Sequence, residues 1–199
     1  MDTAGQASRL LEKGVGQASR LSKYMNFNES KKNTIGELSE ALNGINEKEA
    51  EEFLVRILDA RRIFVAGAGR SGLMLRAFAK RLRHLGKESY VVGETVTPAI
   101  GKGDLLVAAS GSGKTGGVLN IMKRAAKYKA GVVLITASPS RKKTAGLIIT
   151  VPPVFSSRQL MASLFEQTLL LFCDAVCLVL KDRLKVSEAQ MRKSHANLE

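Results

Sequence analysis

Two short turns rich in glycine and serine carry the residue types best suited to bind an anion. The first, Gly-Ala-Gly-Arg-Ser-Gly at residues 67–72, follows the apolar run 63–66, and the second, Ser-Gly-Ser-Gly-Lys-Thr at residues 110–115, follows the apolar run 105–109. Small residues at the carboxyl end of a parallel strand let backbone N–H groups and hydroxyls converge on an anion, and the positive end of the following helix favours negative charge there. Two such turns in one sheet predict a site for a phosphorylated small molecule.

The second turn offers more hydrogen-bonding groups than a helix cap requires. The hydroxyls of Ser110, Ser112 and Thr115 stand beside the backbone N–H groups of Gly111 and Gly113. A helix cap uses one such hydroxyl. The remaining groups favour phosphate binding over capping alone.

A dinucleotide site is an alternative for the first turn. Gly67, Gly69 and Gly72 satisfy the glycine fingerprint of such sites, and Glu94 stands near the distance expected for a ribose-binding acid. A nicotinamide site does not require the separate anion-binding groups of the second turn, however. We therefore favour a different ligand.

A P-loop fits the second turn poorly. Gly-Lys-Thr at residues 113–115 matches the end of that motif, but the motif requires a glycine where Ala108 stands, inside the predicted strand. The loop would be too short to wrap the phosphates of a nucleotide. The spacing therefore disfavours a kinase or NTPase.

The elements that must position these turns alternate between strand and helix. Short runs rich in Val, Ile and Leu predict buried parallel strands, and longer segments between and after them predict helices. This alternation indicates an α/β protein, a three-layer αβα sandwich around a five-stranded parallel sheet of flavodoxin-like type, with the ligand at the carboxyl ends of the strands. The strands are expected at 62–66, 89–93, 104–109, 131–136 and 147–151, and the helices at 71–86, 115–129, 159–182 and from about Ser187, with a shorter link over 138–146.

The first part of the chain is expected to be a separate extension. Gly-Gln-Ala-Ser-Arg-Leu at residues 5–10 recurs at residues 16–21, a spacing that suits a helix. We predict a helical or disordered extension over residues 1–32 and the sugar-phosphate domain over residues 33–199. The domain is expected to open with an amphipathic helix over 33–60, broken near residues 43–44.

Composition narrows the class of protein. The chain has 199 residues, is 45% hydrophobic, and shows neither a signal-peptide pattern nor an uninterrupted apolar span, so we expect a cytoplasmic protein without a membrane segment. The net charge of +13 favours small anions, whereas 5% aromatic residues and the lack of a recognition motif disfavour nucleic acid. Cys173 and Cys177 share one helical face among apolar residues and are expected in the core rather than at a metal.

Several motifs of the sequence resemble those of a known family. The pattern Ser-Gly-Ser-Gly-x-Thr at 110–115 is similar to the phosphate signature of SIS (sugar isomerase) domains. Four further motifs resemble, more specifically, the 6-phospho-3-hexuloisomerase family, and the likeness covers residues 35–199. They are the glycine turn at 67–72, Val-Gly-Glu-Thr-Val-Thr-Pro at 92–98, Ser-Leu-Phe-Glu-Gln at 163–167 and His-Ala-Asn-Leu-Glu at 195–199.

The resemblance implies an activity. It implies a sugar-phosphate isomerase of the aldose/ketose type that interconverts 3-hexulose 6-phosphate and fructose 6-phosphate through a 2,3-enediol. It places that step in formaldehyde fixation by the ribulose monophosphate pathway, with no metal or organic cofactor. The alternative is a non-catalytic SIS module that senses a sugar phosphate.

The resemblance also implies roles for particular residues. Glu166 corresponds to the general base, although an ion pair to a neighbouring helix is the alternative for this carboxylate. His195 corresponds to a proton-transferring histidine that reaches a neighbouring subunit's site, the alternative being an exposed tail residue. Ser71 and the turn at 110–115, Lys114 included, correspond to substrate-binding residues. Arg70 is a candidate partner for the oxyanion or the phosphate.

Three positions depart from the family's pattern. Lys114 stands where the family usually has an acidic residue, Ala162 where it usually has glycine, and Ser194 where it usually has a basic residue. These departures bear on efficiency and substrate preference more than on fold.

The helix expected over 159–182 is apolar on nearly every side. Such a helix must be covered on more than one face, so a homo-oligomer is predicted. The resemblance implies that this oligomer is a tetramer.

Overall fold

The computed structural model describes residues 25–138, 144–153, 157–195 and 197. At its centre lies a parallel sheet of five strands in the order β2-β1-β3-β4-β5, which places the first glycine-bearing strand next to the second. This confirms the predicted fold, and each strand lies within two residues of its expected position. The strands are β1 (Ile63–Gly67), β2 (Ser89–Val91), β3 (Leu105–Ala109), β4 (Gly131–Thr136) and β5 (Leu147–Thr150).

The strands are apolar throughout because both faces of the sheet are covered. Ile63 and Val65 of β1 join one hydrophobic cluster, whereas Phe64 and Ala66 join the other. Alternate residues of a strand point to opposite faces. A strand buried on both faces therefore reads as a continuous apolar run rather than an alternating one.

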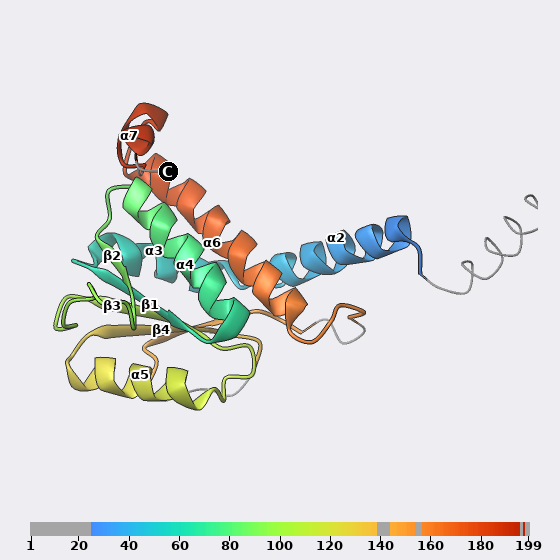
Figure 1. Ribbon diagram of the computed structural model, residues 1–199, viewed down its shortest axis with the longest axis horizontal. Helices are drawn as coiled ribbons and strands as arrows, with labels where there is room; N and C mark the ends of the chain where they lie inside the picture. Colours follow the sequence, from blue (N-terminus) through green and yellow to red (C-terminus); the bar gives the residue numbers. More distant parts are fainter. Residues whose placement is uncertain (1–24, 139–143, 154–156, 196, 198–199) are drawn as a thin grey trace, which may run out of the picture.

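Helices form the two outer layers (Figure 1). One face of the sheet carries α3 (Glu47–Asp59), α4 (Gly69–His84) and α6 (Ser163–Arg183), and the other carries α5 (Gly116–Lys127). The short α7 (Glu188–Lys193) follows α6 and lies near the end of α4. Its N-cap is Ser187, which forms a capping box with Gln190, as the sequence predicted.

The expected break near residues 43–44 is present. The helix α2 (Phe27–Asn43) ends at Gly44, and α3 begins at Glu47. A Cβ on Gly44 would lie 2.5 Å from Cγ of Pro152, so this close approach requires glycine. Because α2 spans residues 27–43, the predicted boundary after residue 32 falls inside one helix. The repeated segment, residues 5–21, lies outside the described residues.

The two long helices α4 and α6 run side by side in the same direction (Figure 1). Arg70 and Glu166 meet at their N-terminal ends, and Arg81 and Cys177 line one cavity near their C-terminal ends. Both N-termini therefore lie at the carboxyl edge of the sheet.

The helix α6 begins at Ser163, four residues later than expected. It is the one helix among the described residues that is long and apolar enough to cross a membrane. Its most apolar stretch of 18 residues has a mean hydropathy of 1.8, and half of that stretch is buried inside the protein. A core helix passes the same test. Cys173 and Cys177 are buried on it as free thiols, confirming their place in the core, and burial raises the pKa of Cys177 to about 12.

Candidate functional site

The two glycine turns lie next to each other at the carboxyl edge of the sheet. Gly67, the last residue of β1, pairs with Ala109, the last residue of β3. The chain reverses its direction of winding between these two strands, since β2 lies outside β1 and β4 outside β3. Ligands of such sheets bind at this switch point. The structure thus brings together the two turns that the sequence singled out.

The first turn is tight because its glycines touch. A Cβ on Gly72 would lie 2.6 Å from the carbonyl oxygen of Gly67, and Gly69 has a φ of 55°. Ala68 stands at the N-cap of α4 and offers no side-chain cap. Ser71, in the first turn of α4, is buried. The N-terminus of α4 therefore points its dipole at the site without a capping side chain.

The hydroxyls of the second turn are already ordered. Ser110 and Thr115 share a hydrogen bond of 2.8 Å between their side-chain oxygens, and the backbone N–H of Lys114 donates to Oγ of Ser112 at 3.2 Å. Gly113 has a φ of 62°. Thr115 is the N-cap of α5 but makes no side-chain cap bond. These hydroxyls organise the turn and do not cap the helix.

Glu166 lies in the first turn of α6 and is buried. Its Oε2 is 2.8 Å from Nε of Arg70, and Nη1 of Arg70 donates to Oγ of Ser163 at 3.2 Å. The ion pair to a neighbouring helix, which the sequence offered as the alternative to a base, is therefore present. Its partner belongs to the first glycine turn, however, so the pair is part of the same site.

Phe165 connects α6 to the second turn. A Cβ on Gly111 would lie 3.1 Å from Cδ1 of Phe165. The first turn of α6 thus packs directly over residues 110–115. Glycine at 111 gives this contact room, because a larger residue would require the ring of Phe165 to shift.

Sequence reasoning missed a third strand end. Thr136 closes β4, and its Oγ1 donates to the carbonyl oxygen of Gly111 at 3.4 Å and accepts from the backbone N–H of Ser138 at 3.1 Å. A Cβ on Gly113 would lie 3.1 Å from Cβ of Ser138. Thr136 and Ser138 thus contact and support the second turn, residues 110–115, which we call the serine turn. The available signal was a hydroxyl residue at the end of the strand predicted over 131–136, with another two residues later.

The electrostatics of the site favour an anion. The N-termini of α4, α5 and α6 lie around it, and each carries a partial positive charge. Arg70 is half exposed and Lys114 is exposed, so both cations can reach a ligand. One carboxylate, Glu166, lies among these positive groups.

His195 does not join this site within one chain. Its ring stacks on His84 with centroids 5.1 Å apart, near the C-terminal end of α4. This end of the molecule is remote from Glu166, because the length of α6 separates them: its last residue, Arg183, lies about 26 Å from Glu166 along the helix axis, at a rise of 1.5 Å per residue. Burial, followed by the charges of His195, Arg81 and Lys80, lowers the pKa of His84.

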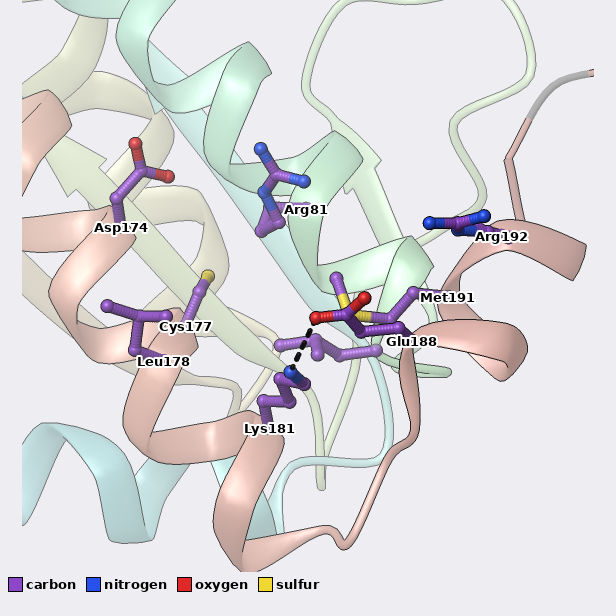
Figure 2. Close-up of a pocket in the computed structure, with 9 residues that line it drawn as sticks. Arg81, Asp174, Cys177, Leu178, Lys181, Glu188, Met191 and Arg192 are labelled. Carbon is purple, nitrogen blue, oxygen red and sulfur yellow. Dashed lines mark ion pairs between the residues drawn. The ribbon is translucent and has the colours of Figure 1, made fainter.

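A cavity of about 400 Å³ lies at this far end, between α4, α6 and α7 (Figure 2). Its walls combine the apolar side chains of Leu178 and Met191 with an ion pair of 3.8 Å between Lys181 and Glu188. It contains none of the residues of the two turns. The candidate site is therefore defined by its chemistry and its place in the sheet, not by the size of a cavity.

Comparison with known proteins identifies the class. The SIS domain family matches residues 56–171, and the chain belongs to this family. Within it, a relative from Bacillus subtilis (strain 168) is 40% identical over 175 residues, which cover 83% of this chain and 95% of the relative, and one from Mycobacterium gastri is 43% identical over 154 residues, covering 72% and 77%. Both are named 3-hexulose-6-phosphate isomerase. The chain falls among these isomerases, which confirms the resemblance seen in its motifs.

A solved structure agrees. A protein from Methanococcus jannaschii, whose structure led to an inferred function of 3-hexulose-6-phosphate isomerase, is 35% identical and superimposes with a TM-score of 0.79. The match covers 86% of this chain and 99% of that protein. The sheet and helices that position the two turns are thus shared along nearly the whole of that protein.

Proposed function

We propose that the protein interconverts 3-hexulose 6-phosphate and fructose 6-phosphate, a step of formaldehyde fixation by the ribulose monophosphate pathway. The observation that carries this proposal is the position of Glu166. Its buried carboxylate lies beside Arg70 of the first glycine turn, on the helix turn that packs over the serine turn. A base, a cation and a phosphate cradle therefore share one small site.

The substrate's phosphate binds at residues 110–115. Backbone N–H groups at the N-terminus of α5 and the hydroxyls of Ser110, Ser112 and Thr115 supply hydrogen bonds, and the helix dipole supplies positive potential. Lys114 offsets part of the phosphate charge from the exposed side of the turn. Ser71 extends the same set of donors from the neighbouring turn.

Glu166 then acts as the general base. Its carboxylate removes the proton from C2, the electron pair forms the C2–C3 double bond of the enediol, and the C3 carbonyl oxygen gains negative charge. The half-exposed guanidinium of Arg70 turns from Glu166 toward that oxygen and stabilises it. The proton of the O2 hydroxyl passes to the O3 oxyanion, protonated Glu166 returns its proton to C3, and the carbonyl re-forms at C2. We propose that the reaction uses neither a metal nor an organic cofactor.

A homo-oligomer, which we propose to be a tetramer, would complete the site. Leu171, Leu178 and Val179 leave an apolar strip exposed along α6, as expected of a helix that a second subunit covers. His195 lies far from Glu166 in its own chain, so it would serve the site of a neighbouring subunit and move the proton between O2 and O3. A phosphorylated sugar as substrate favours a cytoplasmic location, without a nucleic-acid or membrane partner.

Lys114 and Ala162 motivated the alternative, a module that senses a sugar phosphate without turnover, but the relatives named 3-hexulose-6-phosphate isomerase do not favour it. The test is incubation of the purified protein with 3-hexulose 6-phosphate, followed by ¹³C NMR. An isomerase yields fructose 6-phosphate at a rate proportional to protein concentration. A sensor binds the sugar phosphate and leaves it unchanged.

A further inference from the structure

Glu37 is a carboxylate of α2 that faces the segment leading into α6. Its Oε2 accepts hydrogen bonds from Oγ of Ser157 at 2.8 Å and from Nε2 of Gln159 at 3.0 Å, and its Oε1 accepts one from the backbone N–H of Arg158 at 2.9 Å. Oγ of Ser157 also accepts from the backbone N–H of Gln159 at 3.2 Å. One side chain thus fixes three consecutive residues, which we call the α6 strap (residues 157–159).

Apart from its contacts with Arg70 and with the second glycine turn, the start of α6 has little else to hold it. Its N-cap is Ala162, which has no side chain able to cap the helix. Met161 adopts a φ of 52°, a conformation that costs a side-chain-bearing residue free energy, and both Leu160 and Met161 are exposed. One hydrogen bond of 2.9 Å, from the backbone N–H of Ser163 to the carbonyl of Leu160, closes the turn. The strap therefore depends on α2 for its position.

The chain and a few hydrogen bonds link Glu37 to the candidate base, because the strap continues directly into Leu160, whose carbonyl accepts the hydrogen bond from Ser163. A cavity of about 230 Å³ between α2 and α6 is lined by Glu37, Arg158 and Ser163 among others. Oγ of Ser163 accepts a hydrogen bond from Arg70, which also pairs with Glu166. Movement of the strap would shift Ser163 and the first turn of α6, and with them Glu166.

We propose that Glu37 is a positioning residue of the isomerase site: by holding the α6 strap, it sets where α6 begins and where Glu166 points. This inference rests on the proposed function. Glu37 lies before residues 56–171, the part that matches the SIS family, so the N-terminal helix α2 contributes to the site from outside that part.

We call the three hydrogen bonds from the strap to Glu37 the clamp. The clamp requires the charged form of Glu37. Burial opposes ionisation, but the hydrogen bonds from Arg158, Ser157 and Gln159 outweigh it and lower the pKa of Glu37 below its usual value. The carboxylate is therefore ionised at neutral pH, where it accepts all three hydrogen bonds.

The variant Glu37→Gln tests the clamp with little change of shape. The amide of glutamine has one N–H₂ group in place of one of the two carboxylate oxygens. This group is a hydrogen-bond donor and would face the donors of the strap, so it cannot accept their hydrogen bonds. Glu40→Gln is the matched control, because Glu40 lies one turn further along α2 and is exposed. We expect kcat of Glu37→Gln to fall on the order of 10- to 100-fold, as displaced catalytic groups do, with KM within a few-fold of the wild type and Glu40→Gln unchanged.

Two further measurements separate positioning from general damage. Amide hydrogen exchange of Glu37→Gln should accelerate in residues 157–166 and stay unchanged in β1 and β3. The double variant Glu37→Gln/Glu166→Gln should be no slower than Glu166→Gln alone, because Glu37 acts through Glu166.

Unchanged exchange in residues 157–166, or faster exchange with a normal kcat, would overturn the clamp. So would a double variant whose losses multiply. If the wild-type protein does not convert the sugar at all, the proposed function fails, and the exchange experiment alone then supports or overturns the clamp.

Discussion

Replacing Glu166 with glutamine separates its two roles, as a base and as a partner of Arg70. The amide keeps the size of the side chain and can still accept a hydrogen bond from Nε of Arg70, now 2.8 Å from the carboxylate. Because Arg70 is half exposed, losing the charge should cost about 0.5–1 kcal/mol of unfolding free energy. For a domain of this size, that lowers Tm by about 1–4 °C.

The effect on catalysis should be far larger. Loss of a general base lowers kcat by about 10²- to 10⁴-fold, which corresponds to roughly 3–5 kcal/mol of barrier. The assay compares initial rates of fructose 6-phosphate formation, with substrate affinity measured separately by calorimetry on the inactive variant. Affinity should change little, because the phosphate binds at residues 110–115.

The matched control is Asp174→Asn, a carboxylate further along α6 that lines the far cavity (Figure 2). It should retain wild-type kcat. Near-normal turnover by Glu166→Gln would refute the assignment of the base and leave Glu166 as a structural ion-pair partner. A drop in Tm well beyond a few degrees would refute the view that the ion pair is weak.

Three further predictions concern the phosphate, the stability and the assembly. Ser110→Ala and Ser112→Ala should each lose roughly 1.5–3 kcal/mol of affinity for phosphorylated sugars, about 10- to 100-fold in Kd by calorimetry, and equal weakening toward an unphosphorylated analogue would show that the turn does not read phosphate. Asp104→Asn should cost about 3 kcal/mol in urea unfolding, because the buried carboxylate accepts hydrogen bonds from Arg62 at 2.7 and 3.1 Å. Burial raises the pKa of Asp104, but hydrogen bonds from Arg62 and Arg61 outweigh it, so the pKa of Asp104 is lower in the folded protein than in the unfolded chain. The stability that ionised Asp104 contributes is therefore complete above the unfolded pKa of about 4 and is lost as the pH falls through the lower folded pKa. An Asp104→Asn protein whose stability is as pH-sensitive as that of the wild type below pH 4 would contradict this. Mixing inactive Glu166→Gln subunits with inactive His195→Ala subunits should restore part of the activity, whereas an active monomer in sedimentation would exclude a shared site.

Much of the fold follows from local patterns. The five strands were found because both faces of the sheet are buried, which makes each strand a continuous apolar run. The break after Asn43 and the last helix after Ser187 were found because glycine and a capping box mark helix ends in the sequence itself. The place of both glycine turns at the carboxyl edge of one sheet followed from the topology of parallel sheets, whereas their direct pairing came from the structure.

What escaped prediction depends on contacts between distant segments. The apolar pattern continues through Leu160 and Met161, so the sequence placed the start of α6 too early, whereas the positive φ of Met161 delays it to Ser163. The ion pair between Arg70 and Glu166 joins segments far apart in the chain. No periodicity reveals such a pair, or the clamp that Glu37 places on the α6 strap.

The central claim is that this site moves a proton between C2 and C3 of a hexulose phosphate. Its most direct test is conversion of 3-hexulose 6-phosphate in D₂O by the wild-type protein, followed by NMR. The expected result is fructose 6-phosphate in which any deuterium gained from solvent lies on C3. Absence of conversion, or deuterium on C1 as a 1,2-enediol would leave it, would contradict the claim.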